Sequence, residues 1–505
     1  MLNELVLKLS ASKLDDRFGQ LVRESFLLGS LLALFDGLSK RLKSLNFAPR
    51  LGQSLNTLSF LILLVLFAAL GLPQFASDKE ALALIALAAG GIYLVSRLLG
   101  SGSTFKFNMM DLMVALYLGA NIISSISSHY LPQSIKGLSK VAVYTLSYFL
   151  LKASLLDRKE RLPWYLSAAL LSGLAVSLYG LYQYKIGVAP LATWEDPTVE
   201  NKGTRIYSTL GNPNLLAGYL LPLAPLALAM STYIGKAKSK LRFLISPLFL
   251  ITAIITAVAI FLTGSRGGYL SIIGTGGFIV LALSVYFFSK KPKLIAPSAL
   301  IFLAVAAALY AALHFLMPTF EQRLASIFAG SEHSSNAYRM HVWRASMAMF
   351  ADNWWLGVGS GNSAFRLAYG LYMKSGFDAL GTYCVPLEVG VETGILGLVS
   401  FGLLILFSFA RAHLLFYKDS NLSYLALGLA AALFSLMVQG MVDTVFYRPQ
   451  VHFLFWLVIA AISALSSQEE SRGTEPEPGD NSEKCQNQIL TVANLIYISQ
   501  VLWEY

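Results

Sequence analysis

The chain consists of long apolar runs separated by shorter polar connections. The runs recur at about 20 residues, which is the length that a helix needs to cross a bilayer. They lack the two-residue alternation of strands, which favours helices over a membrane β-barrel. The sequence therefore predicts an all-α polytopic membrane protein with about twelve transmembrane helices. The predicted spans are 57–73, 80–97, 109–127, 138–152, 163–184, 214–232, 241–263, 268–288, 294–316, 386–410, 421–440 and 448–466.

Three regions depart from this pattern. Residues 1–55 are charged and partly amphipathic, which predicts a cytoplasmic arm lying on the lipid surface. Within the transmembrane domain, 56–466, residues 317–385 form a long outer loop, and apolar residues at helical spacing after a Ser-Asn start predict a helix over 336–351. Residues 467–505 begin acidic and poor in apolar side chains, which predicts a disordered cytoplasmic tail.

The composition agrees with a membrane protein and explains most of the charge. Of the 505 residues, 56% are hydrophobic and 13% are charged, against about 25% charged residues in soluble domains. The formal net charge of +10 follows from topology, because cytoplasmic loops collect Lys and Arg. With the N-terminus inside, the inner loops hold most of the short-loop basic residues. Since the number of spans is even, we expect both termini in the cytoplasm, membrane lipid as a partner and no nucleic acid.

Several arginines fall in the predicted outer loops, where this rule does not explain them. A guanidinium held in a fixed position with little water binds phosphate or carboxylate by paired hydrogen bonds. The SRGG turn at 265–268 permits a tight reversal between two helices, which places Arg266 between the two helix ends. We expect Arg205, Arg266, Arg339 and Arg344 to form an outward-facing anion pocket. The alternative is that single arginines pair with outer carboxylates or reach lipid phosphates. The full outer set is Arg205, Arg266, Arg323, Arg339, Arg344, Arg366 and Arg448.

Carboxylates within the spans are few, notably Asp111, Glu388 and Glu392. Glu388 and Glu392 are four residues apart, so they share one helix face near the outer end of their span. Intramembrane acids are candidates for function, but a glutamate at the end of a span also reaches the interface without any further role. The six histidines lack metal-ligand spacing, and we predict no metal and no cofactor.

Two glycine-containing motifs are interpreted as turns. GNPN at 211–214 predicts a turn that caps the following helix, with Asn212 or Asn214 as the N-cap. GVGSGN at 357–362 resembles a nucleotide loop only in its glycines, because it does not lie between a strand and a helix.

The longest motifs together resemble one known family. LATWEDP, TRIYSTLGNPNLLAGYL, TGSRGG, SSNAYRMHVWRASMAMFADNWWLGVGSGN and PLEVGVETGILGL are similar, in this order, to the IctB-type bicarbonate (inorganic carbon) transporter family. That family is a branch of the O-antigen ligase and polymerase superfamily. The resemblance covers roughly residues 20–465 and implies a multi-pass protein of the bacterial inner membrane.

The resemblance implies a glycan transfer from a polyprenyl diphosphate carrier at the periplasmic face, without a metal. The outer arginines of the superfamily hold the diphosphate, which carries over to Arg266 and Arg339. Ligases have a histidine in an HNxxL motif, where this chain has YCVPL with Tyr383 in the histidine position.

Three classes of function stay open on these residues. We favour glycan transfer, with Glu388 or Tyr383 orienting or deprotonating the acceptor hydroxyl. The alternative is transport of bicarbonate, or assistance to its transport, but the distinctive charges gather at one face rather than at the bilayer midplane. A noncatalytic scaffold is the third class.

Overall fold

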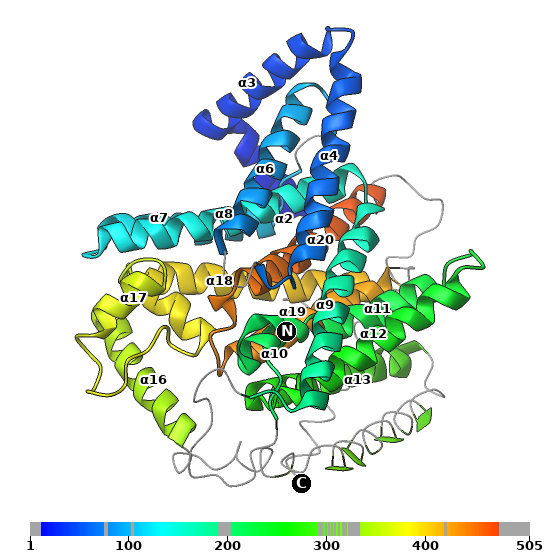
Figure 1. Cartoon of the computed structure of the whole chain (residues 1–505). Helices are drawn as coiled ribbons and strands as arrows, with labels where there is room; N and C mark the ends of the chain where they lie inside the picture. Colours follow the sequence, from blue (N-terminus) through cyan, green and yellow to red (C-terminus); the bar gives the residue numbers. More distant parts are fainter. Residues whose placement is uncertain are drawn as a thin grey trace, which may run out of the picture.

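The structure, a computed structural model, describes residues 12–74, 79–102, 106–189, 204–290, 334–418 and 422–473, with scattered positions between 296 and 321. Every regular element in these ranges is a helix (Figure 1). Ten of the helical segments are long and apolar enough to cross a membrane, which confirms the predicted fold class. The bounds are α2 Ser12–Glu24, α3 Phe26–Lys43, α4 Ala48–Ala69, α6 Lys79–Leu98, α7 Met109–Ser127, α8 Leu131–Asp157, α9 Arg161–Ile186, α10 Pro213–Leu220, α11 Leu223–Gly235, α12 Arg242–Leu262, α13 Arg266–Lys290, α16 Ser334–Asp352, α17 Asn362–Tyr369, α18 Val385–Tyr417, α19 Ser423–Gly440 and α20 Pro449–Gly473.

Three predicted spans differ in detail from the helices that form. The span predicted at 214–232 is two helices, α10 and α11, because Pro222 lacks the N–H that a continuous helix needs at that point. α8 has 27 residues but carries three lysines, and it is not among the ten apolar segments. α4 begins at Ala48, well before the predicted edge at residue 57, with a proline in its first turn.

Two predictions fall outside the described residues. They are most of the span at 294–316 and the tail from residue 474 onward. The predicted tail begins later than residue 467, because α20 continues to Gly473. In the predicted arm, 1–55, the described part consists of α2, α3 and the start of α4.

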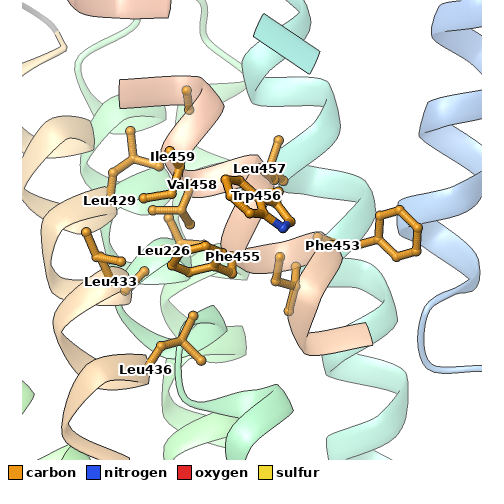
Figure 2. Close-up of a cluster of buried hydrophobic side chains, with 14 of the residues drawn as sticks. Leu226, Leu429, Leu433, Leu436, Phe453, Phe455, Trp456, Leu457, Val458 and Ile459 are labelled. Atoms are coloured by element: carbon orange, nitrogen blue, oxygen red, sulfur yellow. The ribbon is translucent and has the colours of Figure 1, made fainter. Parts of the chain in front are cut away.

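α20 forms the centre of the bundle. The membrane-spanning window of α20 is 94% buried, whereas that of α13 is 17% buried. Figure 2 shows aromatic and aliphatic side chains of α20 packed against leucines of α19 and α11. A helix that is apolar all round is either buried among other helices or exposed to lipid, and α20 is of the first kind. The residues that Figure 2 labels are Leu226, Leu429, Leu433, Leu436, Phe453, Phe455, Trp456, Leu457, Val458 and Ile459.

The two ends of the bundle differ in what covers them. α16 and α17 cover the end where α18 begins, and this is called the α16 end below (Figure 1). α16 confirms the helix predicted over 336–351. The opposite end carries α2 and α3 and is called the arm end.

Buried ion pairs join the helices at the arm end. Lys152 Nζ of α8 lies 2.5 Å from Asp111 Oδ2 of α7. Arg411 Nη2 of α18 donates to Asp15 Oδ2 of α2 at 2.6 Å, and the main-chain N–H of Met109 donates to Asp15 Oδ1 at 2.8 Å. Asp111 also accepts a hydrogen bond from its own N-cap residue in a capping box. Asp111 therefore has a structural role here.

Candidate functional site

Arg205 is fixed between the ends of three helices at the α16 end. The main-chain N–H of Ser208 donates to Gln183 Oε1 of α9 at 2.7 Å, which fixes the segment. Arg205 Nε donates to the carbonyl oxygen of Thr263, just after α12, at 2.9 Å. Its Nη2 lies 3.4 Å from Asn214 Oδ1 of α10. The guanidinium is half-buried and held in one position by these contacts.

The GNPN turn supplies that last contact. Asn212 is the N-cap of α10, because its side chain accepts from the N–H groups of Asn214 and Leu215 at 2.8 and 3.3 Å. Of the two predicted cap residues, the structure therefore selects Asn212. The Asn214 side chain is then free of the capping role and faces Arg205.

The SRGG turn forms the start of α13, as its glycines predicted. The serine of the turn accepts a hydrogen bond from the N–H of Gly268 at 3.2 Å. A Cβ on Gly267 would lie 3.0 Å from Val442 Cγ2, and one on Gly268 would lie 3.1 Å from Ala217 Cβ. Both glycines are needed because α13 begins in close contact with α10 and with the segment after α19. Arg266 is half-buried in the first turn of α13, where main-chain N–H groups and the helix dipole favour an anion.

Asp443, between α19 and α20, brings together arginines from distant parts of the chain. Arg339 Nη2 of α16 lies 3.7 Å from Asp443 Oδ2, and the two side chains are 17% and 11% exposed. Burial raises the pKa of the Asp443 carboxyl, and the positive charges of Arg339 and Arg205 oppose that rise. Arg205 and Arg339 therefore act on the same carboxylate. We call Arg205, Arg266, Arg339 and Asp443 the arginine group.

Tyr383 lies beside the arginine group, just before α18. Its φ of 53° is in the left-handed region, which is uncommon for a residue other than glycine. Its N–H donates to Thr444 Oγ1 at 3.2 Å, and its carbonyl oxygen accepts from Trp343 Nε1 at 3.4 Å. The Cζ atom of Arg339 is 6.0 Å from the centre of the Tyr383 ring. Burial raises the pKa of the Tyr383 phenol well above its ordinary value.

A cavity of about 320 Å³ lies between α8, α17, α18 and α20. No residue of the arginine group lines it, but Glu388 of its lining is close enough to Asp443 to interact with it electrostatically. The cavity contains both predicted glutamates, which face it from the same side of α18. The buried Oε2 atom of Glu388 has no hydrogen-bond partner among the described residues. Charged groups of both signs line the cavity, including Lys136, Lys140, Arg366, Glu388 and Glu392, together with His452.

α18 is interrupted just after these glutamates. Gly394 has φ 64° and ψ −163°, so the helix breaks there. The GVGSGN loop enters the break: the N–H groups of Val358 and Gly359 donate to the carbonyl oxygens of Val391 and Glu392 at 2.9 and 3.1 Å. This pairing satisfies main-chain groups that the break would leave exposed to lipid. The loop is a structural plug, as its interpretation as a turn predicted.

Part of the chain matches the model of a known protein family. Residues 251–402 match the O-antigen ligase family model. The matched segment runs from α12 to α18, so it contains Arg266, Arg339, Tyr383 and Glu388. Arg205 and Asp443 lie outside it in sequence and complete the arginine group. The match supports the superfamily that the motifs predicted and its role in glycosyl transfer at a membrane. No curated protein matches the chain, and the IctB-type branch stays a prediction.

The structure brings most of the predicted site residues to the α16 end of the bundle, but not Arg344. Arg344 is exposed, two residues from both buried Val342 and buried Ser346 on α16. Five residues separate it from Arg339, which is about 140° around the helix. The prediction that Arg344 joins the anion pocket therefore finds no support in its position.

The remaining outer arginines have separate contacts. Arg366 Nη2 lies 2.9 Å from Asp378 Oδ2, an exposed pair of the kind that the alternative interpretation expected. Arg448 Nη2 donates to the carbonyl oxygen of Leu210 at 3.2 Å. Arg323 lies outside the described residues.

Sequence reasoning did not identify four residues of the site. Asp443 lies in the short connection between the predicted spans 421–440 and 448–466, with Arg448 nearby. A carboxylate in such a short connection is the feature of the sequence that could have indicated it as a site residue. Lys136 and Lys140 are basic residues at the predicted outer side, so the rule that singled out the arginines also applied to them. His452 is enclosed by rings, with the centroids of Tyr144 and Phe446 at 4.3 and 4.7 Å, and no spacing in the sequence pointed to it.

Proposed function

We propose that the protein transfers a glycan from a polyprenyl diphosphate carrier to an acceptor hydroxyl at the periplasmic face. The proposal rests on two features at the α16 end. One is the arginine group, and the other is the cavity lined by Glu388, whose buried Oε2 atom has no hydrogen-bond partner among the described residues. The family match to residues 251–402 supports the same chemistry.

The arginine group suits a diphosphate. The 3.7 Å separation between Arg339 and Asp443 exceeds the length of a hydrogen bond. A phosphate oxygen can therefore approach Arg339 more closely than the resident carboxylate does. Arg205 is already positioned by Thr263 and Asn214, and Arg266 adds a second cation at a helix start. A diphosphate offers several oxygens in the geometry that guanidinium groups pair with.

These cations stabilise the leaving group. The acceptor oxygen forms a bond to the anomeric carbon of the donor sugar, and the bond from that carbon to the diphosphate oxygen breaks. The electron pair leaves with the carrier diphosphate, so negative charge develops beside the arginines. Fixed positive charges at that position lower the barrier, and removing one such group typically costs about 10²–10³ in rate.

Glu388 is the better of the two predicted candidates for the base. The proton of the acceptor hydroxyl goes to the carboxylate of Glu388, a residue that lines the cavity and whose buried Oε2 atom has no hydrogen-bond partner among the described residues. Tyr383 stays a protonated phenol near neutral pH because burial raises its pKa. A protonated phenol donates a hydrogen bond but cannot accept the proton, so Tyr383 positions groups near Arg339.

One observation favours the alternative, bicarbonate transport. Transporters place anions beside interrupted helices, and α18 is interrupted at Gly394, close to the two glutamates. In this chain the loop at 354–359 fills the break, since Ile395 N–H donates to the carbonyl oxygen of Trp354 at 2.7 Å. The interrupted helix therefore supports bicarbonate transport less strongly than the arginine group supports glycan transfer.

The test uses purified protein in liposomes with a polyprenyl-diphosphate-linked glycan and a glycan acceptor. We expect glycan transfer, a loss of about 10²–10³ in rate for Arg339→Ala, and a loss of about 10²–10⁴ for Glu388→Gln. Arg344→Ala is the matched control, because it removes the same charge from the exposed face of the same helix, and it should transfer normally.

Two results would count against glycan transfer. Equal losses for Arg339→Ala and Arg344→Ala would show that charge at the surface matters rather than the arginine group. Accumulation of labelled bicarbonate in the same liposomes, lost in Arg339→Ala, with no glycan transfer at any concentration of carrier, would favour the transport function instead.

A further inference from the structure

The arm is part of the folded structure rather than a loose extension. Asp15 of α2 is 5% exposed and binds both Arg411 of α18 and the main chain at the start of α7. In addition, Ser39 Oγ of α3 donates to the carbonyl oxygen of Arg97, near the end of α6, at 3.2 Å. These contacts fix α2 and α3 against the ends of three membrane-spanning helices. Figure 1 shows α3 at the end of α4 and α6, far from α16.

One face of α3 exposes a stripe of leucines. Leu28, Leu31, Leu34 and Leu38 recur at helical spacing, and Leu34 is 73% exposed. The last turn of the helix is basic, with Lys40, Arg41 and Lys43. A helix with an apolar stripe and a basic end, held level with the ends of membrane-spanning helices, has the properties of an interfacial helix. The stripe fits the acyl region of a bilayer, and the basic end fits its headgroups.

A cavity of about 230 Å³ lies beneath α3, against the connection between α6 and α7. Arg23, Lys43 and Arg97 line it, and Asp36 is the one carboxylate among its lining residues. Arg97 Nη1 lies 3.6 Å from Asp157 Oδ1, so that cation already has a counter-charge. Arg23 and Lys43 are exposed at the cavity and supply the remaining positive charge.

The connection between α6 and α7 is shaped around these cations. Gly100 has φ 88°, and a Cβ there would lie 2.2 Å from Lys43 Cε. Gly102 has φ 92°, and a Cβ there would lie 2.5 Å from Arg97 Nη1. The positive φ favours glycine at both positions, and without a Cβ the main chain packs closely against the side chains of Lys43 and Arg97.

We infer that this cavity binds the headgroup of an anionic phospholipid. The phosphate pairs with Arg23 and Lys43, and the acyl chains lie along the leucine stripe of α3. The volume is below the roughly 300–1,000 Å³ of pockets that enclose drug-sized ligands, so a headgroup fits and a larger soluble ligand does not. Anionic lipids concentrate in the cytoplasmic leaflet, which is where the predicted topology places the arm. This site is independent of the proposed glycan transfer.

The experiment measures lipid binding by the full chain in neutral detergent, by native mass spectrometry with phosphatidylglycerol or phosphatidylcholine added. We expect phosphatidylglycerol to bind preferentially. The double variant Arg23→Gln/Lys43→Gln should weaken its binding about 25-fold, since one cation near an anionic headgroup contributes about fivefold. The matched control is Lys40→Gln/Arg41→Gln, which removes the same charge from exposed positions of α3 that do not line the cavity. It should weaken binding less than about threefold.

Three results would overturn the inference. The first is an equal loss in the two double variants, which would mean diffuse attraction to the surface. The second is equal binding of phosphatidylcholine and phosphatidylglycerol to the unmodified chain. The third is displacement of phosphatidylglycerol by millimolar inorganic phosphate, which would identify a free-anion site without a role for the leucines. Because all four substituted residues are exposed, the thermal unfolding temperature of both variants should stay unchanged, and this confirms that they fold.

Discussion

Replacing Gly394 by alanine tests whether helix α18 is interrupted at this residue. Gly394 has φ 64° and ψ −163°, a combination that residues with a side chain adopt only with strain, at about 1–3 kcal/mol. A Cβ there would also lie 2.3 Å from the carbonyl oxygen of Trp355. Relieving an overlap with main-chain atoms requires a backbone shift, at about another 1–3 kcal/mol. The Gly394→Ala variant should therefore lose about 2–6 kcal/mol of stability.

The matched control lies on the same helix. A Cβ on Gly402 would have no other atom within 4 Å, and its backbone is helical, so Gly402→Ala should stabilise the protein by about 0.5–1 kcal/mol. The assay is thermal unfolding in detergent, followed by tryptophan fluorescence, because Trp354 and Trp355 lie at the break and report on it directly. We expect the midpoint of Gly394→Ala to fall by several degrees and that of Gly402→Ala to rise or stay. If Gly394→Ala unfolds at the same temperature as Gly402→Ala, α18 does not have the interrupted conformation described above.

Three further predictions concern single side chains. Lys152→Met should cost about 3–5 kcal/mol, because it leaves the buried Asp111 without its cation, and adding Asp111→Asn should recover part of this loss in thermal unfolding; an unchanged single variant would contradict the buried pair. Burial raises the pKa of Asp443, so the folded state binds its proton more tightly than the unfolded state does, and stability should fall as pH rises from about 3.9 to the raised pKa. Asp443→Asn should remove that part of the pH dependence, as measured by unfolding midpoints across the acidic range, and a variant with the same pH profile as the unmodified protein would be inconsistent with it. Tyr383→Phe keeps the ring and the same backbone strain but removes the hydroxyl, and it should keep glycan transfer within about tenfold because the phenol is not the base; a loss as large as that of Glu388→Gln would reverse this assignment.

The ends of the membrane helices were predicted well where a capping residue or a turn in the adjacent sequence marks them. The predicted span 109–127 coincides with α7, because Asn108 and Asp111 form a capping box at its start. The cap at GNPN, with Asn212 as one of two candidates, and the SRGG turn were predicted correctly for the same reason, since a cap and a glycine turn depend on adjacent residues. The predicted span 214–232 is confirmed by the apolar segment Pro213–Gly235, but hydropathy does not register the missing N–H of Pro222, where the segment divides into two helices.

The site was less predictable because its contacts join distant segments. Arg339 meets Asp443 across about a hundred residues, and Lys136 shares a cavity with Glu388 only because α8 packs against α20, which in turn packs against α18. A hydrophobic pattern states which face of each helix is buried, but it does not state which helices are neighbours. Basic residues that contradict the topology rule directed attention to the arginines, and the packing of the bundle places Arg339 beside Asp443 and leaves Arg344 on the exposed face of α16.

The two ends of the molecule use charge in different ways, and this difference indicates where function resides. At the arm end, Lys152 with Asp111 and Arg411 with Asp15 lie 2.5 and 2.6 Å apart. Charges this deeply buried are tolerated only when they are closely paired, so these four side chains are occupied in holding helices together. At the α16 end, Arg339 and Asp443 are 3.7 Å apart, and Glu388 Oε2 has no described partner. A buried guanidinium that the fold leaves loosely paired costs stability, and an anion that pairs with Arg339 would recover part of that cost. This supports the proposal that an anionic substrate binds at the α16 end.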